Sequence, residues 1–395
     1  MPHPIVEEFA KYATLTTNSG YEMSAAGRPD IVAAIAIHCT DIQKLIASKP
    51  AFFTAFDYGW AAKPENYAHP VEAQLQFGLL LVISEIIPTH ADYPRLGNIC
   101  IRTLPSRHIN MEAVVRGPNK YIVVATAMIR MMQAWAVTMR HVGDIGRAAP
   151  EDTPVICIAN FLGGQDLEKA VRTNWPAVTP YLDYLVDTCI AYRLGEVPER
   201  TFALAENPDA SLLHATQFLF VGEMFFICHE LIHVLKHIEA PKERSDDEEV
   251  EADHWAASLF IIFQSQLARW YAANGKEHLA AQPTVQAAVY AGPAIFFTVM
   301  HTLLFIERLT VAAQDDAATK LEVLNREFKL NGARLFAYEK ALQRFKLDKQ
   351  GPIYQAALQQ LDVIAVACRM RLIERYALPA QVSLDQNLFR GFPES

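Results

Sequence analysis

The stretch His229-Glu230-Leu231-Ile232-His233 decides how this chain is interpreted. It lies inside a long apolar run that predicts one buried helix over residues 209–240. Residues four positions apart share one face of a helix, so His229 and His233 can direct both imidazoles to one metal ion. Glu230 lies one position further round, where a carboxylate can act as a base on a metal-bound water. The pattern therefore predicts a zinc site with Glu230 as its catalytic base.

A second helix is expected directly downstream. Ser245-Asp246-Asp247-Glu248 is a capping box, the S-x-x-E signature of a helix N-terminus. Behind it, Glu249 and Asp253 are four residues apart in an E-x-x-A-D pattern and share a face. A catalytic zinc takes three protein ligands and keeps a fourth position open for water. Glu249 is the candidate third ligand, and Asp253 is the candidate acceptor that fixes the tautomer of a ligating histidine.

H-E-x-x-H followed by E-x-x-A-D resembles the gluzincin zinc metallopeptidases, with the match running over residues 229–253. Residues 108–124 are similar to the hairpin that precedes the zinc helix in compact gluzincins. The resemblance implies that an edge strand at residues 108–115 aligns an extended protein or peptide substrate. Among the gluzincins, the chain is most similar to the Lit-like phage-exclusion peptidases, on residues 229–237, the helical surround and the absence of an obvious signal sequence.

This resemblance implies a zinc-dependent endopeptidase that cleaves an intracellular protein, in phage exclusion or defence, or in regulated toxicity. Glu230 would take a proton from the attacking water and pass it to the leaving amine. Gluzincins often place a His, Tyr or Arg opposite the zinc to stabilise the oxyanion. His301 and Arg308 are the candidates for that role, with a core histidine and a surface arginine as the plainer interpretation.

Two other interpretations of the motif stay open. In a metzincin-like site, Glu239 would occupy the third-ligand position, but Lys236 stands where those enzymes have a glycine turn. In a structural or regulatory metal site of a non-catalytic interaction protein, four protein ligands would close the coordination, with Asp246, Asp247 or Glu239 as the fourth. Glu230 argues against a closed site, which needs no base. Glu223, in the same apolar run, is expected to be a core carboxylate without a catalytic role.

Composition limits the classes of function and location. The net charge is −9 and no long basic run occurs, which argues against nucleic-acid binding. The six cysteines are scattered and the first residues carry no basic-then-apolar signal, so we expect a cytoplasmic protein with reduced thiols. The uncharged residues 284–306 are long enough to span a bilayer, which leaves inner-membrane association as the alternative. The sequence does not indicate an oligomeric state.

The pattern along the chain predicts a mainly α fold with a small β-sheet, of the α+β class. We expect an N-terminal helical region over residues 1–106, a metallopeptidase core over 107–310 and a C-terminal helical region over 311–395. A short strand is expected at 100–104, a hairpin at 108–124 and a buried strand at 155–161. Besides the two metal-site helices, helices are expected at 29–47, 71–87, 125–142, 175–193, 285–309, 317–345 and 352–376.

Overall fold

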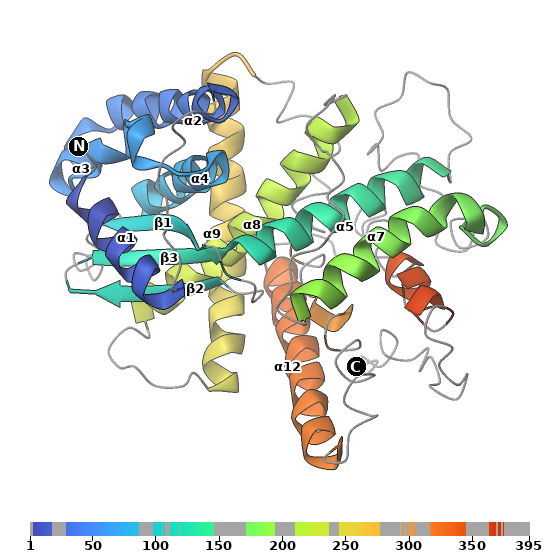
Figure 1. The fold of residues 1–395 in the computed structure, drawn as a ribbon. Helices are drawn as coiled ribbons and strands as arrows, with labels where there is room; N and C mark the ends of the chain where they lie inside the picture. The colour runs from blue at the N-terminus through green and yellow to red at the C-terminus, as the bar shows by residue number, and fades with distance from the viewer. Residues whose placement is uncertain are drawn as a thin grey trace.

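The computed structural model confirms a mainly helical fold with one small sheet (Figure 1). The residues that it describes are 3–17, 29–86, 98–104, 106, 111–117, 119–145, 171–193, 210–236, 245–276, 293, 297, 300–302, 304, 317–344, 363–368, 370–372 and 374.

The helices follow the apolar periodicity of the sequence. Four of them, α2, α4, α7 and α12, begin and end within two residues of their expected bounds. The elements before the sheet are α1 (Pro4–Thr17), α2 (Pro29–Ser48), α3 (Pro50–Ala55), the 3-10 turns η1 (Tyr58–Ala62) and η2 (Pro64–Asn66), and α4 (Pro70–Ile86). Those after the sheet are α5 (Thr126–Ile145), α7 (Trp175–Arg193), α8 (Ala210–Lys236), α9 (Asp246–Ala273) and α12 (Ala317–Arg344). The sequence analysis missed α1, α3 and the two 3-10 turns.

The sheet has three strands, β1 (Ile99–Leu104), β2 (Met111–Arg116) and β3 (Asn119–Ala125), in the order β1-β3-β2. The predicted hairpin is confirmed: β2 pairs antiparallel with β3, with Ala113 opposite Ile122. The strand before the hairpin, which was expected only as an isolated element, pairs with β3 in parallel. Both β1 and β2 are therefore sheet edges, with β3 between them.

Side chains from neighbouring elements occupy the outer edge of β1. The backbone N–H of Ile99 donates to the Tyr58 hydroxyl, that of Ile101 to Gln76 Oε1, and that of Thr103 to Glu72 Oε1, at 3.0, 2.9 and 2.7 Å. Gln76 also donates to the Ile99 carbonyl at 3.2 Å. A sheet edge with unpaired amides can pair with another strand. These hydrogen bonds occupy the outward amides of β1, so they oppose the addition of a strand there.

The helix with the H-E-x-x-H motif is buried on every side over its described half, as its apolar composition predicts. It packs against α9, α5 and α4 and contacts β2 and β3 (Figure 1). Phe225 lies at the centre of this packing, with the rings of Phe260, Phe297 and Tyr338 each 5.1–6.2 Å from its own and close to perpendicular. The motif is thus held in a rigid, close-packed core.

The helix α12 lies beside α9 and runs parallel to it (Figure 1). Two arginine–aspartate pairs fix this direction: Arg326 with Asp246, and Arg334 with Asp253. The arginines are eight residues apart and the aspartates seven, which is about 12 and 10 Å along two helices at 1.5 Å per residue. The C-terminal region therefore packs directly against the helix that follows the motif.

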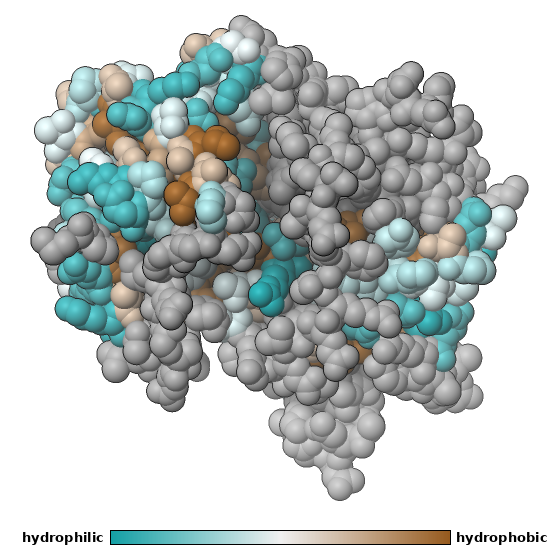
Figure 2. Space-filling model, turned by 45° about the horizontal axis from the view of Figure 1, so that its top comes forward, coloured by the Kyte–Doolittle hydropathy of each residue, from teal (hydrophilic) through white to brown (hydrophobic). Residues whose placement is uncertain are grey.

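One described helix is long and apolar enough to cross a membrane by length and composition, namely α2 over Ile31–Ser48. Core helices of globular proteins pass the same test, so this is weak evidence of a membrane span. Val32 and Ile37 on this helix are 44% and 63% exposed, and Figure 2 shows hydrophobic and hydrophilic residues interspersed over the N-terminal helices at its upper left. Most of the segment singled out from the sequence, 284–306, and all of the expected strand at 155–161 lie outside the described residues.

Candidate metal centre

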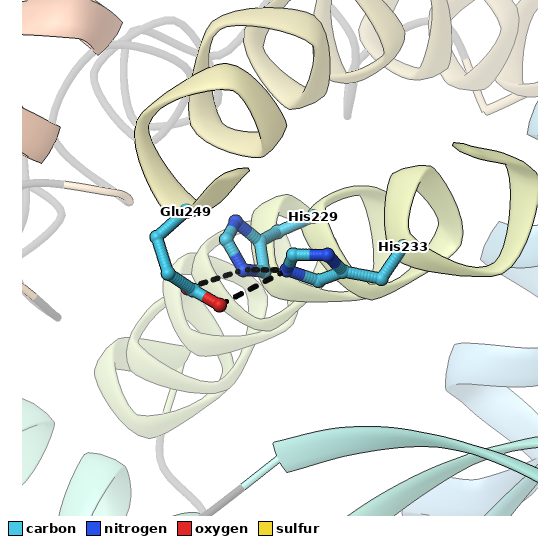
Figure 3. A group of neighbouring side chains, drawn as sticks. All are labelled: His229, His233 and Glu249. Atoms are coloured by element: carbon cyan, nitrogen blue, oxygen red, sulfur yellow. Dashed lines mark hydrogen bonds and ion pairs between the residues drawn. The ribbon is translucent and has the colours of Figure 1, made fainter. Parts of the chain in front are cut away.

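Two imidazoles face each other across one turn of α8. His229 and His233 are 3% and 2% exposed, and their Nε2 atoms lie 3.0 Å apart (Figure 3). The helix brings them together because residues four apart share a face, as the sequence predicted. Two imidazole nitrogens directed at one point are an arrangement that a metal ion can occupy.

The third member comes from the first turn of α9. Glu249 places its Oε2 at 3.2 Å from His229 Nε2 and its Oε1 at 3.3 Å from His233 Nε2 (Figure 3). The predicted capping box positions this turn: the Ser245 hydroxyl accepts from the Glu248 N–H at 3.2 Å, and Glu248 Oε2 accepts from the Ser245 N–H at 2.8 Å. The cap therefore sets where the helix begins and so where Glu249 points.

These three side chains form a group that could hold a metal ion. Their ligand atoms, two ring nitrogens and a carboxylate oxygen, all lie within 4.8 Å of one another, and it is the one such group found among the described residues. The fold brings together the three residues that the sequence analysis selected as candidate ligands, although they are separated by up to 20 positions in the chain. Imidazole and carboxylate donors suit several divalent metals, so the geometry alone does not select one.

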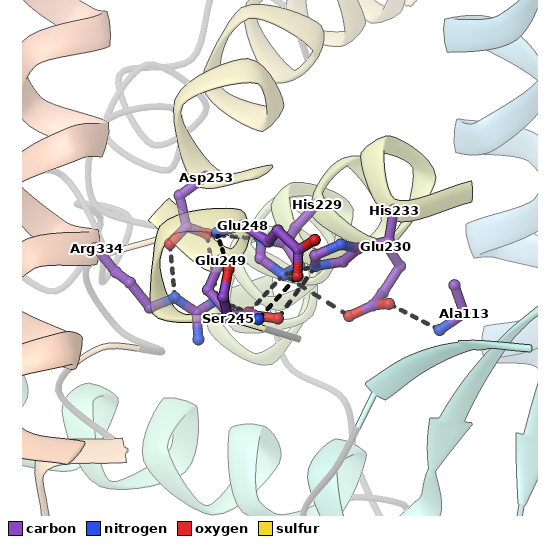
Figure 4. A network of polar contacts seen from close by, with 9 residues as sticks. All are labelled: Ala113, His229, Glu230, His233, Ser245, Glu248, Glu249, Asp253 and Arg334. Carbon is purple, nitrogen blue, oxygen red and sulfur yellow. Dashed lines mark hydrogen bonds and ion pairs between the residues drawn. The ribbon is translucent and has the colours of Figure 1, made fainter. Parts of the chain in front are cut away.

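Asp253 fixes the orientation of the first histidine. Its Oδ1 accepts from His229 Nδ1 at 2.7 Å, which leaves the opposite ring nitrogen, Nε2, to face the group (Figure 4). This is the role that the E-x-x-A-D spacing predicted. Carboxylates behind a ligating histidine set both its tautomer and the angle of its ring. Asp253 is fully buried at 0% exposure, so this contact is screened from water.

The carboxylates also shift the ionisation of the group. Burial alone lowers the pKa of His229, but the charge and hydrogen bond of Asp253 outweigh it and raise that pKa to about 9. Burial alone raises the pKa of Glu249, yet the hydrogen bonds from the two histidines bring it well below the usual range. In the absence of a metal, a proton on the His229 imidazole therefore balances part of the charge of the buried carboxylates.

Glu230 points away from the histidine pair and toward the sheet. Its Oε2 accepts from the backbone N–H of Ala113 on β2 at 2.7 Å, while its Oε1 lies 3.9 Å from His229 Nε2 (Figure 4). The carboxylate of the predicted base thus stands between the metal-binding group and an edge strand. The Ala113 amide faces away from β3, so by the alternation of an antiparallel strand the amides of Met111 and Val115 face the same way.

Arg334 on α12 completes the centre, and the sequence analysis missed it. Its Nε donates to Asp253 Oδ2 at 2.6 Å, and a terminal nitrogen donates to Oδ1 at 3.2 Å (Figure 4). A terminal nitrogen also lies 3.7 Å from Glu249 Oε2. Burial alone lowers the pKa of Arg334, but Asp253, with the charges of Glu249 and Glu230, raises that pKa above its ordinary value. One arginine thus contacts both carboxylates that α9 contributes.

Other residues considered from the sequence lie elsewhere. His301 contacts Asn331 of α12, with Nδ1 2.6 Å from the amide nitrogen, so its role as oxyanion stabiliser stays a prediction. Asp246, a candidate fourth ligand, is paired with Arg326 at 2.7 Å, and Asp247 is exposed. Arg308, His237 and Glu239 lie outside the described residues. Lys236 pairs with Glu251 at 2.6 Å near the end of α8.

Glu223 is a core carboxylate, as expected, at 4% exposure. Burial raises its pKa to about 8, which keeps it uncharged at neutral pH. It precedes Glu230 by two helical turns and takes no part in the metal-binding group.

Comparisons with known proteins give no relative: no family model matches the chain, and neither a curated protein nor a solved structure is found to be similar.

Proposed function

We propose that this protein is a zinc-dependent endopeptidase. The observation that carries the proposal is the position of Glu230, whose carboxylate lies beside the group of His229, His233 and Glu249 and directly against an edge strand. A metal site with three protein ligands leaves a position for water, and an adjacent carboxylate supplies a base for it. Peptide hydrolysis needs both, together with a surface that aligns the substrate backbone.

The spacing of the ligand atoms supports zinc. Tetrahedral zinc with bonds of about 2.0–2.1 Å to nitrogen and oxygen has ligand atoms about 3.3 Å apart. Nε2 of His229 and Nε2 of His233 lie 3.0 Å apart, and they lie 3.2 and 3.3 Å from Oε2 and Oε1 of Glu249, respectively. These separations are close to those of tetrahedral zinc, and rotation of the Glu249 carboxylate would direct one of its oxygens to the ion.

Side chains of the protein would supply the proton transfer and the orientation of the ligands. A bound zinc would supply Lewis-acid activation of the water and of the scissile carbonyl. Glu230 takes one proton from the attacking water as the new C–O bond forms, and delivers it to the leaving nitrogen as the C–N bond breaks. Asp253 keeps the His229 ring in one orientation throughout.

The two edges of the sheet favour β2 as the substrate-aligning strand. Side chains of Tyr58, Gln76 and Glu72 occupy the edge of β1, so an added strand has no access there. At the β2 edge, Glu230 accepts from the N–H of Ala113, and the N–H groups of Met111 and Val115, on either side of it, also face outward and would pair with an added strand. An extended peptide that paired with β2 would have its backbone within reach of Glu230. We propose an intracellular protein as the substrate, in the cytoplasm, with phage exclusion or regulated toxicity as the setting that the resemblance suggests.

The test combines metal content with cleavage. We expect about one zinc per wild-type chain, and a loosened or absent zinc in Glu249→Ala. Glu230→Gln is expected to retain zinc but to cleave at least about a hundredfold more slowly, because the amide cannot accept the proton. Cleavage is measured by mass spectrometry on a proteome-derived peptide library with both proteins. Equal cleavage by Glu230→Gln and wild type would overturn the mechanism.

The burial of the group favours a second candidate, a metal site that stabilises the fold of a regulatory or interaction protein. His229, His233 and Glu230 are each less than 5% exposed. In that case chelation of the metal would lower the melting temperature strongly, wild type would cleave no peptide in the library, and Glu230→Gln would leave both properties unchanged.

A further inference from the structure

We propose that Arg334 is a positioning residue of the metal centre, through which the packing of α12 against α9 controls how tightly the metal is held. The inference rests on the proposed metal site but not on the proposed hydrolysis. It gives α12, a helix of the expected C-terminal region, a direct part in the centre. Arg334 acts through Asp253 and Glu249, the two carboxylates that it contacts.

The Asp253 carboxylate is fixed by three hydrogen bonds. Oδ1 accepts from His229 Nδ1 at 2.7 Å and from a terminal nitrogen of Arg334 at 3.2 Å, while Oδ2 accepts from Arg334 Nε at 2.6 Å. A planar guanidinium that contacts both oxygens leaves the carboxylate one orientation. Without Arg334, Asp253 could rotate about its terminal bond, and the His229 ring would lose its fixed support.

Arg334 also balances the charge that the site gathers. Glu230, Glu249 and Asp253 bring three carboxylates into a nearly closed space, and Arg334, 16% exposed, is the guanidinium that contacts two of them. With one divalent ion bound, two neutral histidines and this arginine, the assembly carries no net charge. Removal of Arg334 would leave an uncompensated buried charge, which is costly in a low-dielectric environment.

The arginine is itself held in place by the packing of α12. Its guanidinium lies over the Phe297 ring at 5.8 Å, and the Asn331 amide, one turn earlier, donates to the Phe297 carbonyl at 2.9 Å. One turn later, the Tyr338 ring packs against Phe225 of α8 at 5.1 Å. Asn331, Arg334 and Tyr338 share one face of α12. The position of Arg334 thus depends on contacts with both helices that carry the ligands.

The second arginine pair provides a matched control. Arg326 contacts Asp246 at 2.7 and 3.0 Å, two turns earlier on the same helix pair, but the Arg326 side chain is exposed and that of Asp246 is about half exposed. Loss of that pair perturbs the α9–α12 contact without touching Asp253. If Arg334 were only a link between helices, the two substitutions would have similar effects on the metal.

The experiment measures zinc affinity and release by competition with a chromogenic chelator, with helical content checked by circular dichroism. We expect Arg334→Gln to weaken zinc binding by about 10- to 100-fold, the range for supporting residues of a metal site. Arg326→Gln should stay within about twofold of wild type. Arg334→Lys keeps the charge without the two-point contact and should fall between. If Arg334→Gln does not fold, the zinc affinities of Arg334→Lys and Arg326→Lys are compared instead.

A double variant tests the route through Asp253. In the Asp253→Asn background, Arg334→Gln should weaken zinc binding by a smaller factor than it does in wild type, because only the contact with Glu249 is then left to lose. A folded Arg334→Gln protein with wild-type zinc affinity, or with the same loss as Arg326→Gln, overturns the inference. Absence of zinc from wild type overturns it together with the proposed function. Bound zinc without any peptide cleavage overturns only the hydrolysis.

Discussion

The backbone N–H of Ala113 donates to the carboxylate of Glu230 at 2.7 Å, across 117 positions of the chain. This bond joins the edge strand to the predicted base. It leaves one carboxylate oxygen engaged with β2 and the other, Oε1, on the side of His229. The strand therefore orients Glu230 as well as offering a surface for a substrate.

Ala113→Pro removes this donor while keeping the strand's pairing with β3, because the amide points outward and proline is tolerated at such positions of an edge strand. We expect zinc affinity to stay within about twofold of wild type and kcat for peptide cleavage to fall about tenfold or more, since Glu230 loses its fixed orientation.

Val115→Pro is the control for Ala113→Pro. The N–H of Val115, like that of Ala113, faces away from β3. Val115 has no contact with Glu230 among those described, and it is 41% exposed. We expect it to raise KM with little change in kcat. A fall in kcat of the same size in both variants would mean that the strand, and not the Glu230 contact, had been damaged.

Glu223→Gln should stabilise the protein at alkaline pH. The pKa of Glu223 is raised by burial to about 8 in the folded protein, so between about 4.5 and 8 the folded state binds a proton that the unfolded state has lost. Stability contributed by this group is present below that window and is lost as pH rises through it. The loss is at most about 1.4 kcal/mol per pH unit.

The measurement for Glu223 is the difference in unfolding free energy between wild type and Glu223→Gln, taken by urea titration at pH 5, 6.5 and 8. The difference should grow with pH in favour of the variant, and other titrating groups cancel in it. A difference that does not change over this range would show that Glu223 is ionised in the folded protein.

Gln76→Leu should destabilise the fold without touching the metal centre. The Gln76 amide bonds both Ile99 O and the Ile101 N–H, so its loss leaves two buried backbone groups of β1 without this partner. We expect a loss of about 2–6 kcal/mol, at about 1–3 kcal/mol for each unsatisfied group. Gln74→Leu, half-buried on the same helix, is the control and should change stability by less than about 1 kcal/mol. Thermal or urea denaturation of the two variants checks this, and equal losses would contradict the role of the Gln76 bonds.

The ligands of the candidate site could be predicted because their positions depend on local rules. The spacing of His229 and His233 requires only a helix, and the capping box at Ser245 fixes the start of the next one. The same local patterns predicted most of the helices and the hairpin of β2 and β3. In each of these elements, the residues that determine the structure lie close to one another in the sequence.

Arg334 and Ala113 could not be found in this way. Nothing in the periodicity of α12 distinguishes Arg334 from Arg326, because the difference arises only once α12 lies parallel to α9. Ala113 acts through its backbone, which carries no sequence signal. A usable signal did exist for Gln76: together with Glu72 it places polar groups four residues apart on one face of a mainly apolar helix, and such groups need partners when they are buried.

The capping box at Ser245 has a kinetic consequence. Glu249 lies in the first turn of α9, and its own N–H bonds the Ser245 carbonyl at 3.2 Å, whereas both histidines lie in a helix interior. Terminal turns are the part of a helix that opens most often, at little free-energy cost. Unwinding of this single turn would carry the carboxylate away while the histidine pair stayed in place. The residence time of a bound ion would then depend on how rarely the first turn of α9 unwinds.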